Sequence, residues 1–127
     1  MSADVLKMIR DGKIAKGNPL DVARLGGIMA AKKTAELIPL CHPLILDFIE
    51  VQCRPSETGI HIEATVVAEG RTGVEMEALT AVSVAALSLY DMCKSADRAM
   101  VISQIRLIEK AGGRSGHFMN LPEEPKP

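Results

Sequence analysis

The sequence has few aromatic residues, and this scarcity narrows the ligands it can bind. Its 127 residues include two phenylalanines, one tyrosine and no tryptophan. Single-stranded nucleic acids bind largely by stacking on such side chains. Fifteen basic residues against sixteen acidic ones leave a net charge of -1, so there is no overall attraction to polyanions. A general nucleic-acid-binding function is therefore disfavoured.

Long hydrophobic runs are also lacking. The most apolar stretch, residues 78–90, is interrupted by Thr80, Ser83 and Ser88, and it falls short of the ~20 residues needed to span a bilayer. It is predicted to be a buried helix. No apolar secretory signal opens the chain, so we expect no membrane association and a cytoplasmic location.

Cysteine is scarce, and the spacing of the three cysteines matches no disulfide or zinc motif. Cys41, Cys53 and Cys93 are odd in number and contain no CxxC pair, which argues against a disulfide framework and a structural zinc site. A metal site built from Cys41, His42 and Cys53 is disfavoured by the irregular spacing.

Apolar periodicity and turn residues predict one domain over residues 1–120, with a flexible C-terminal tail at 121–127. A short helix should follow Ser2 and end near Gly12, and Asn18 and Pro19 should open a helix reaching about Glu36. Strands are expected at 45–54, 60–68 and 100–108, and a helix at 74–95. Gly26 and Gly27 inside the second helix indicate that another backbone approaches there.

This order predicts an α+β fold, with helices on one face of an antiparallel sheet. A strand before the helix that Asn18 opens would complete the β-α-β-β-α-β pattern of a ferredoxin-like sandwich, and that first strand is missing. The sheet edge left open needs cover from another chain or from the first helix.

Several loop residues could carry chemistry. His42 lies between Pro39 and Pro43 in a stiff loop, and histidine is a residue type suited to proton transfer, although a lone histidine is more often structural. Cys41 beside it is either a nucleophile or a buried thiol. Lys16 precedes a helix N-terminus that could help it hold an anion, although it could equally be a solvated side chain.

Charged residues also occur on both predicted long helices. Lys32 interrupts a helix of small residues, where it could serve solubility alone. Glu75 and Glu77 begin the later helix, where capping is the simplest explanation. Asp91 and Lys94 are one turn apart near its end, a spacing typical of a weak surface ion pair.

The distance between Glu77 and Asp91 limits which ligands a single chain can bind with both. Glu77 and Asp91 are fourteen residues apart, which corresponds to roughly 21 Å along a helix. They cannot both contact one small ligand from a single chain.

Further along, Lys110 precedes a loop with Gly112, Gly113 and Gly116 that could hold phosphate oxygens but lacks the Walker pattern.

Taken together, these motifs closely resemble the MoaC family of cyclic pyranopterin monophosphate synthases, which act in molybdenum cofactor biosynthesis. The resemblance is carried, in order along the chain, by Lys16-Gly17, Ala30-Ala31-Lys32, Leu37-Ile38-Pro39-Leu40-Cys41-His42-Pro43-Leu44, Gly70-Arg71-Thr72-Gly73-Val74-Glu75-Met76-Glu77-Ala78-Leu79-Thr80-Ala81, Tyr90-Asp91-Met92-Cys93-Lys94 and Lys110-Ala111-Gly112-Gly113. Family members usually carry Asp at Asn18, Lys at Arg114 and an additional N-terminal segment with a strand.

The resemblance implies a ferredoxin-like subunit in a homohexamer of three dimers, with active sites at subunit interfaces. It implies a lyase that converts 3′,8-cyclo-7,8-dihydro-GTP to cyclic pyranopterin monophosphate and releases pyrophosphate. No cofactor is implied with certainty, and Mg²⁺ accompanying the triphosphate is the one candidate left open.

The family's site residues fall on eight positions here. We predict Lys16, Asp91 and Lys94 as the catalytic, proton-transferring set, and the substrate-binding set is predicted to be Lys32, His42, Glu75, Glu77 and Lys110. No metal ligands are predicted. The alternative from another functional class is a ferredoxin-like module that senses a small molecule without converting it.

Overall fold

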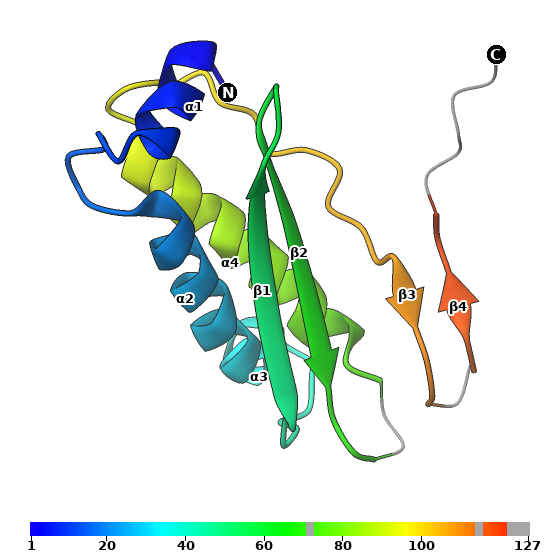
Figure 1. Ribbon diagram of the computed structural model, residues 1–127. Coiled ribbons are helices and arrows are strands. Elements are labelled where there is room, and N and C mark those ends of the chain that lie inside the picture. Colours follow the sequence, from blue (N-terminus) through cyan, green and yellow to red (C-terminus); the bar gives the residue numbers. More distant parts are fainter. Residues whose placement is uncertain (71–72, 114–115, 122–127) are drawn as a thin grey trace, which may run out of the picture.

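A computed structural model describes residues 1–70, 73–113 and 116–121 of the chain. In order, the elements are α1 (Ala3–Arg10), α2 (Pro19–Lys32), α3 (Thr34–Leu37), β1 (Phe48–Pro55), β2 (Ile60–Val67), α4 (Glu75–Cys93), β3 (Glu109–Lys110) and β4 (Phe118–Met119). The long helices α2 and α4 lie on one side of the β1–β2 hairpin (Figure 1). The predicted α+β class with antiparallel strands is confirmed.

Both N-terminal helices begin at the predicted caps. The Val5 N–H donates to the Ser2 hydroxyl at 3.3 Å, and Asn18 Oδ1 accepts from the backbone N–H groups of Leu20 and Asp21. These bonds satisfy donors that have no partner inside the helix.

The prediction that α2 continues to Glu36 is wrong by one turn. At Lys33 the backbone reaches φ -112° and ψ 13° and leaves the helix. The buried Thr34 hydroxyl then donates to the carbonyls of Ala30 and Ala31, at 3.2 and 2.9 Å. The regular helical hydrogen bonds stop at this break, where the Ala30 carbonyl accepts from the Lys33 N–H at 3.0 Å. The Thr34 side chain adds a donor for both carbonyls and so stabilises the new end, and the single turn α3 follows.

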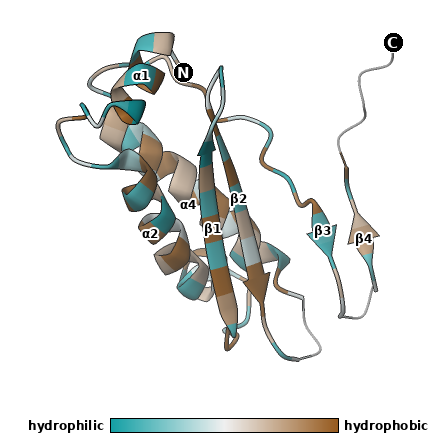
Figure 2. Cartoon of the chain, in the orientation of Figure 1, coloured by the Kyte–Doolittle hydropathy of each residue, from teal (hydrophilic) through white to brown (hydrophobic). Residues whose placement is uncertain are grey.

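The predicted hairpin is confirmed, with Val51 opposite Ala64 near its centre. Hydrophobic and hydrophilic residues alternate along β1 (Figure 2), so one face of the hairpin packs on the helices. The Arg24 Nε–H donates to the Val51 carbonyl at 3.1 Å and ties α2 to β1.

The core lies where α2 and α4 meet, and small residues bring their backbones close. Gly27 is buried, and a Cβ built on it would lie 2.8 Å from the Ala81 carbonyl oxygen of α4. The predicted close approach of another backbone is therefore confirmed at Gly27. At Gly26 the nearest atom is instead a side-chain atom, the Ser88 hydroxyl oxygen.

The predicted strand at 100–108 is wrong for the described residues. That stretch forms no ladder, and only Glu109–Lys110 pairs, in a two-stranded ladder with Phe118–Met119. Gln104 has a φ of 55°, which interrupts an extended strand, and Val101 is 79% exposed. Figure 1 shows β3 and β4 set apart from the hairpin. The Ile108 carbonyl accepts from the Asn120 N–H at 2.7 Å beside this ladder, whereas residues 100–107 have no described partner strand whose backbone could satisfy their own.

Helix α4 is long and apolar enough, by length and composition, to cross a membrane. Here it packs against α2, β1 and β2, and it contributes Ala81, Ala85, Leu89 and Met92 to the buried core. The core helix of a soluble protein meets the same criterion.

Candidate functional site

The predicted catalytic residues meet at the C-terminal end of α4. Asp91 Oδ1 accepts a hydrogen bond from the Lys94 ammonium at 2.7 Å, and Asp91 Oδ2 lies 3.3 Å from the Lys16 ammonium. Lys16 also donates to the Asp91 carbonyl at 3.2 Å. It comes from the loop between α1 and α2, so this cluster joins that loop to α4.

The electrostatics of this cluster favour a charged carboxylate. The hydrogen bond from Lys94, and then the bond and charge of Lys16, lower the pKa of Asp91. One carboxylate therefore stands between two ammonium groups, which leaves a net positive charge at a surface open to solvent. Such a group can hold an anionic ligand while its lysines donate protons.

A second cluster forms at the N-terminal end of α4, where Glu75 pairs with Lys110 at 3.0 Å. The pKa of Glu75 is lowered, first by a hydrogen bond from its own backbone N–H and also by Lys110, while burial opposes the shift. A Cβ built on Gly113 would lie 3.4 Å from the Lys110 ammonium nitrogen and 3.6 Å from the Gly73 nitrogen. The glycine loop after Lys110 is thus brought against the start of α4.

The backbone conformation of this loop explains why it contains glycines. Gly112 and Gly113 have φ values of 82° and 73°, in the left-handed region that side chains rarely adopt. Arg71, Thr72 and Arg114, which belong to the same motifs, lie outside the described residues. The predicted phosphate loop is therefore described only in part.

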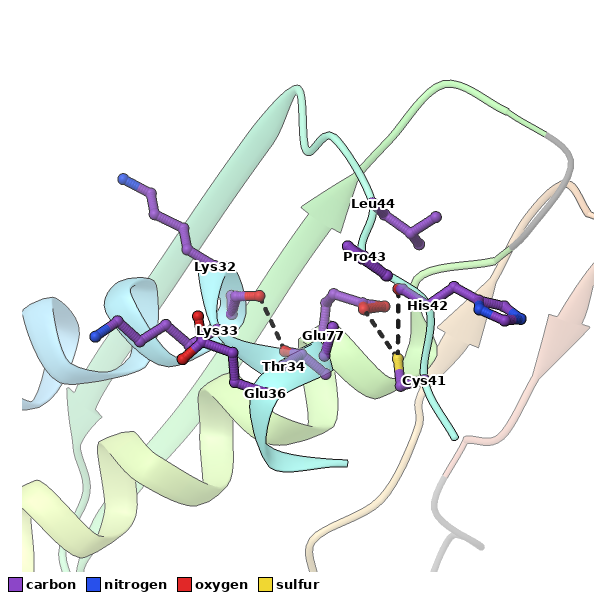
Figure 3. Close-up of a pocket in the computed structure, with 11 residues that line it drawn as sticks. Lys32, Lys33, Thr34, Glu36, Cys41, His42, Pro43, Leu44 and Glu77 are labelled. Atoms are coloured by element: carbon purple, nitrogen blue, oxygen red, sulfur yellow. Dashed lines mark hydrogen bonds between the residues drawn. The ribbon is translucent and has the colours of Figure 1, made fainter. Parts of the chain in front are cut away.

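A pocket of about 320 Å³ opens beside this second cluster. Lys32, Thr34, Cys41, His42 and Glu77 are among its lining residues, and Figure 3 shows Cys41 and Glu77 pointing toward one another. The Cys41 thiol lies 3.8 Å from Glu77 Oε2. In the same view the His42 imidazole and the Lys32 ammonium point away from that pair.

Cys41 is one of the pocket residues that the predicted site omitted. Burial, and then the nearby Glu77 charge, raise the pKa of its thiol, so the unreactive protonated form is favoured over the thiolate. A nucleophilic role is therefore not supported. Its place inside the Leu37–Leu44 motif was the signal that could have included it.

The structure divides the eight predicted residues between two places. Lys16, Asp91 and Lys94 lie at one end of α4, whereas Glu75, Glu77 and Lys110 lie at the other, with His42 and Lys32 lining the adjacent pocket. Since α4 is one uninterrupted helix, Glu77 and Asp91 are separated by roughly 21 Å. Within the described part of the chain, no three His, Cys, Asp or Glu side chains are grouped to hold a metal ion.

Comparison with known proteins agrees with this set of motifs. The MoaC family matches residues 1–113. The cyclic pyranopterin monophosphate synthase of Heliobacterium modesticaldum is 58% identical over 121 residues, covering 94% of this chain and 76% of that protein. The enzyme of the same name from Chloroflexus aurantiacus is 61% identical over 120 residues, covering 93% and 74%. A further one, from Desulfatibacillum aliphaticivorans, is 60% identical over 122 residues, covering 94% and 77%. A family match over most of the chain, together with relatives this similar, establishes that the chain belongs to the MoaC family.

Proposed function

We propose that this chain is a cyclic pyranopterin monophosphate synthase of molybdenum cofactor biosynthesis. It converts 3′,8-cyclo-7,8-dihydro-GTP to cyclic pyranopterin monophosphate and releases pyrophosphate. The observation that carries this proposal is the identity of 58–61% to relatives of that name over more than nine-tenths of the chain. The reaction needs cations for a triphosphate, groups that move protons, and a pocket for a guanine-derived ring, and the two clusters supply these.

The site residues have different proposed roles, according to their chemistry. Lys16 and Lys94, held on either side of Asp91, donate and accept the protons of ring opening and rebuilding. Lys110, Lys32 and His42 bind the phosphates, and Glu75 holds Lys110 in place. Mg²⁺ arriving with the triphosphate is the candidate cofactor, with the phosphate oxygens as its main ligands.

Each active site takes one cluster from each of two chains. A small ligand cannot bridge roughly 21 Å along one helix, so the proton-transferring cluster of one subunit must face the pocket of another. A homo-oligomer, a hexamer of three dimers as the family resemblance implies, provides such interfaces. A cytoplasmic location fits a GTP-derived substrate.

The direct test is product formation from the purified cyclic dihydro-GTP intermediate, with and without added Mg²⁺. We expect cyclic pyranopterin monophosphate and pyrophosphate in equal amounts. Binding of the intermediate without turnover under both conditions would favour the non-catalytic sensing module.

A further inference from the structure

Thr34 is a buried polar residue to which the proposed function assigns no role. The residue is only 2% exposed, and its hydroxyl donates to the carbonyls of Ala30 and Ala31 at 3.2 and 2.9 Å. It also lines the pocket (Figure 3). Because a buried hydroxyl is costly unless it is hydrogen-bonded, these two bonds fix the position of the side chain.

The two bonds hold a break in a helix whose sequence favours continuation. Local signals predict one helix reaching about Glu36, yet α2 ends at Lys32 and the backbone leaves the helical conformation at Lys33. In a continuous α-helix the carbonyl of Ala31 would accept from the N–H four residues further on. Here the Thr34 hydroxyl donates to that carbonyl. A side-chain hydroxyl of this kind competes with helical hydrogen bonding, so Thr34 favours the broken form.

A series of hydrogen bonds leads from this break into the pocket loop. The Ile38 N–H donates to the Thr34 carbonyl at 2.9 Å, and the Cys41 N–H donates to the Ile38 carbonyl at 3.1 Å. The Cys41 thiol in turn lies 3.8 Å from Glu77 Oε2 on α4. The break therefore sets the direction in which the chain enters the loop that carries Cys41 and His42.

Residues on both sides of the break line the same pocket. Lys32 precedes the break, and His42 follows it. A straightened helix would change the separation of these two residues, and small displacements of positioned groups are costly to a site. The cluster around Asp91 lies at the opposite end of α4, so a change at the break leaves that cluster in place.

We propose that Thr34 is a positioning residue of the pocket, whose hydroxyl holds the break between α2 and α3 and so places the loop with Cys41 and His42 opposite Lys32. This inference rests on the proposed function and deepens it, because it names a residue that acts on substrate binding without touching the substrate.

The first test is the kinetics of Thr34→Val, since valine has the shape of threonine without the hydroxyl. The variant should raise KM for the cyclic dihydro-GTP intermediate at least about fivefold and leave kcat within about twofold, because the binding groups around the break are displaced and the catalytic cluster is not. Thr34→Ser keeps the hydroxyl and should keep KM within about twofold of wild type.

The Cys41 thiol provides a second readout that does not depend on turnover. Alkylation by iodoacetamide requires the thiolate, which burial and the Glu77 charge disfavour at Cys41. In Thr34→Val the loop moves away from Glu77, so Cys41 should react at least about threefold faster than in wild type. Cys93, which is fully buried, should keep its rate. Peptide mass spectrometry follows each cysteine separately.

Ser83→Ala is the matched control, because it removes the same kind of bond from the middle of α4. The Ser83 hydroxyl donates to the Leu79 carbonyl at 2.7 Å, and its loss should change neither KM nor the rate at Cys41. If Thr34→Val does not fold, Thr34→Ser and Thr34→Ala are compared in its place. These two variants differ only in the hydroxyl and must differ in KM and in the alkylation rate.

A folded Thr34→Val variant with the wild-type KM, or with the wild-type alkylation rate at Cys41, overturns the inference. A loss confined to kcat also overturns it, as does a Thr34→Ser variant that behaves like Thr34→Val. Wild-type protein that does not turn over the intermediate contradicts the proposed function, and alkylation of Cys41 then decides whether Thr34 places the loop.

Discussion

Replacing Gly27 with alanine tests whether close contact between α2 and α4 holds the two ends of the site in place. The added Cβ would lie 2.8 Å from the Ala81 carbonyl oxygen, 3.1 Å from Val51 Cγ2 and 3.2 Å from Ala85 Cβ. The carbonyl belongs to the backbone of α4 and cannot rotate away, so the helices must separate. Overpacking of this kind costs about 3 kcal/mol at its upper end, and alanine recovers about 1 kcal/mol of helix propensity.

The expected net loss for Gly27→Ala is therefore about 2 kcal/mol in the free energy of unfolding. Gly26→Ala is the matched control, because the closest atom to its Cβ would be the Ser88 hydroxyl oxygen, 2.5 Å away at the end of a side chain that can rotate. Rotation sacrifices the Ser88 hydrogen bond to the Val84 carbonyl, worth about 1 kcal/mol, which offsets the gain in helix propensity. Gly26→Ala should stay within about 0.5 kcal/mol of wild type.

Urea unfolding at one protein concentration measures both variants, and the slopes should remain equal to that of wild type. Thermal unfolding should place Gly27→Ala about 8 °C below wild type. If the two variants have equal stability, or if Gly27→Ala matches wild type, steric contact at Gly27 does not set the spacing of these helices.

Three further predictions concern the site and its assembly. His42→Ala and Lys94→Ala should each lower turnover at least about tenfold with unchanged thermal unfolding, because each removes a positioned charge or proton carrier; turnover within twofold of wild type would remove that residue from the site. The lowered pKa of Glu75 means that its charged form stabilises the fold above its ordinary pKa and that this stabilisation is lost as the pH falls through the folded-state value. Glu75→Gln should accordingly be less stable than wild type at pH 7, and the two proteins should converge as the pH falls below the folded-state pKa of Glu75, which lies beneath its ordinary value; a difference that is constant with pH would contradict the pairing with Lys110. Light scattering at micromolar concentration should give a multiple of 13.6 kDa, and a monomer mass would contradict the shared site.

Local signals in the sequence predicted most of the fold. Ser2 and Asn18 mark helix starts because a capping side chain acts on N–H groups two or three residues away. The end of α2 could not be predicted, since it depends on Thr34 turning back to two carbonyls in a buried position. The strand at 100–108 failed for a similar reason, because an apolar pattern does not reveal whether a partner strand is present.

The individual residues of the candidate site could be predicted from the sequence, but which of them lie together could not. Charged residues in recognisable motifs identified Lys16, Asp91, Lys94 and Lys110, and their pairing partners emerged only with the fold. Cys41 was left out of the predicted set although it lies in the Leu37–Leu44 motif, because its contact with Glu77 joins residues 36 positions apart. Sequence spacing does not reveal a contact between a thiol and a buried carboxylate.

The proposed shared site joins the pocket of one chain to the Asp91 cluster of another. Glu77→Gln alters the pocket and Asp91→Asn alters the Asp91 cluster. Each variant alone should retain less than about a tenth of wild-type turnover. Unfolded together in equal amounts and refolded, the two variants pair at random, so half of the dimers are mixed and one of the two sites in each mixed dimer is intact. We expect the refolded mixture to recover about a quarter of wild-type activity. A mixture of folded variants no more active than their average would contradict the shared site.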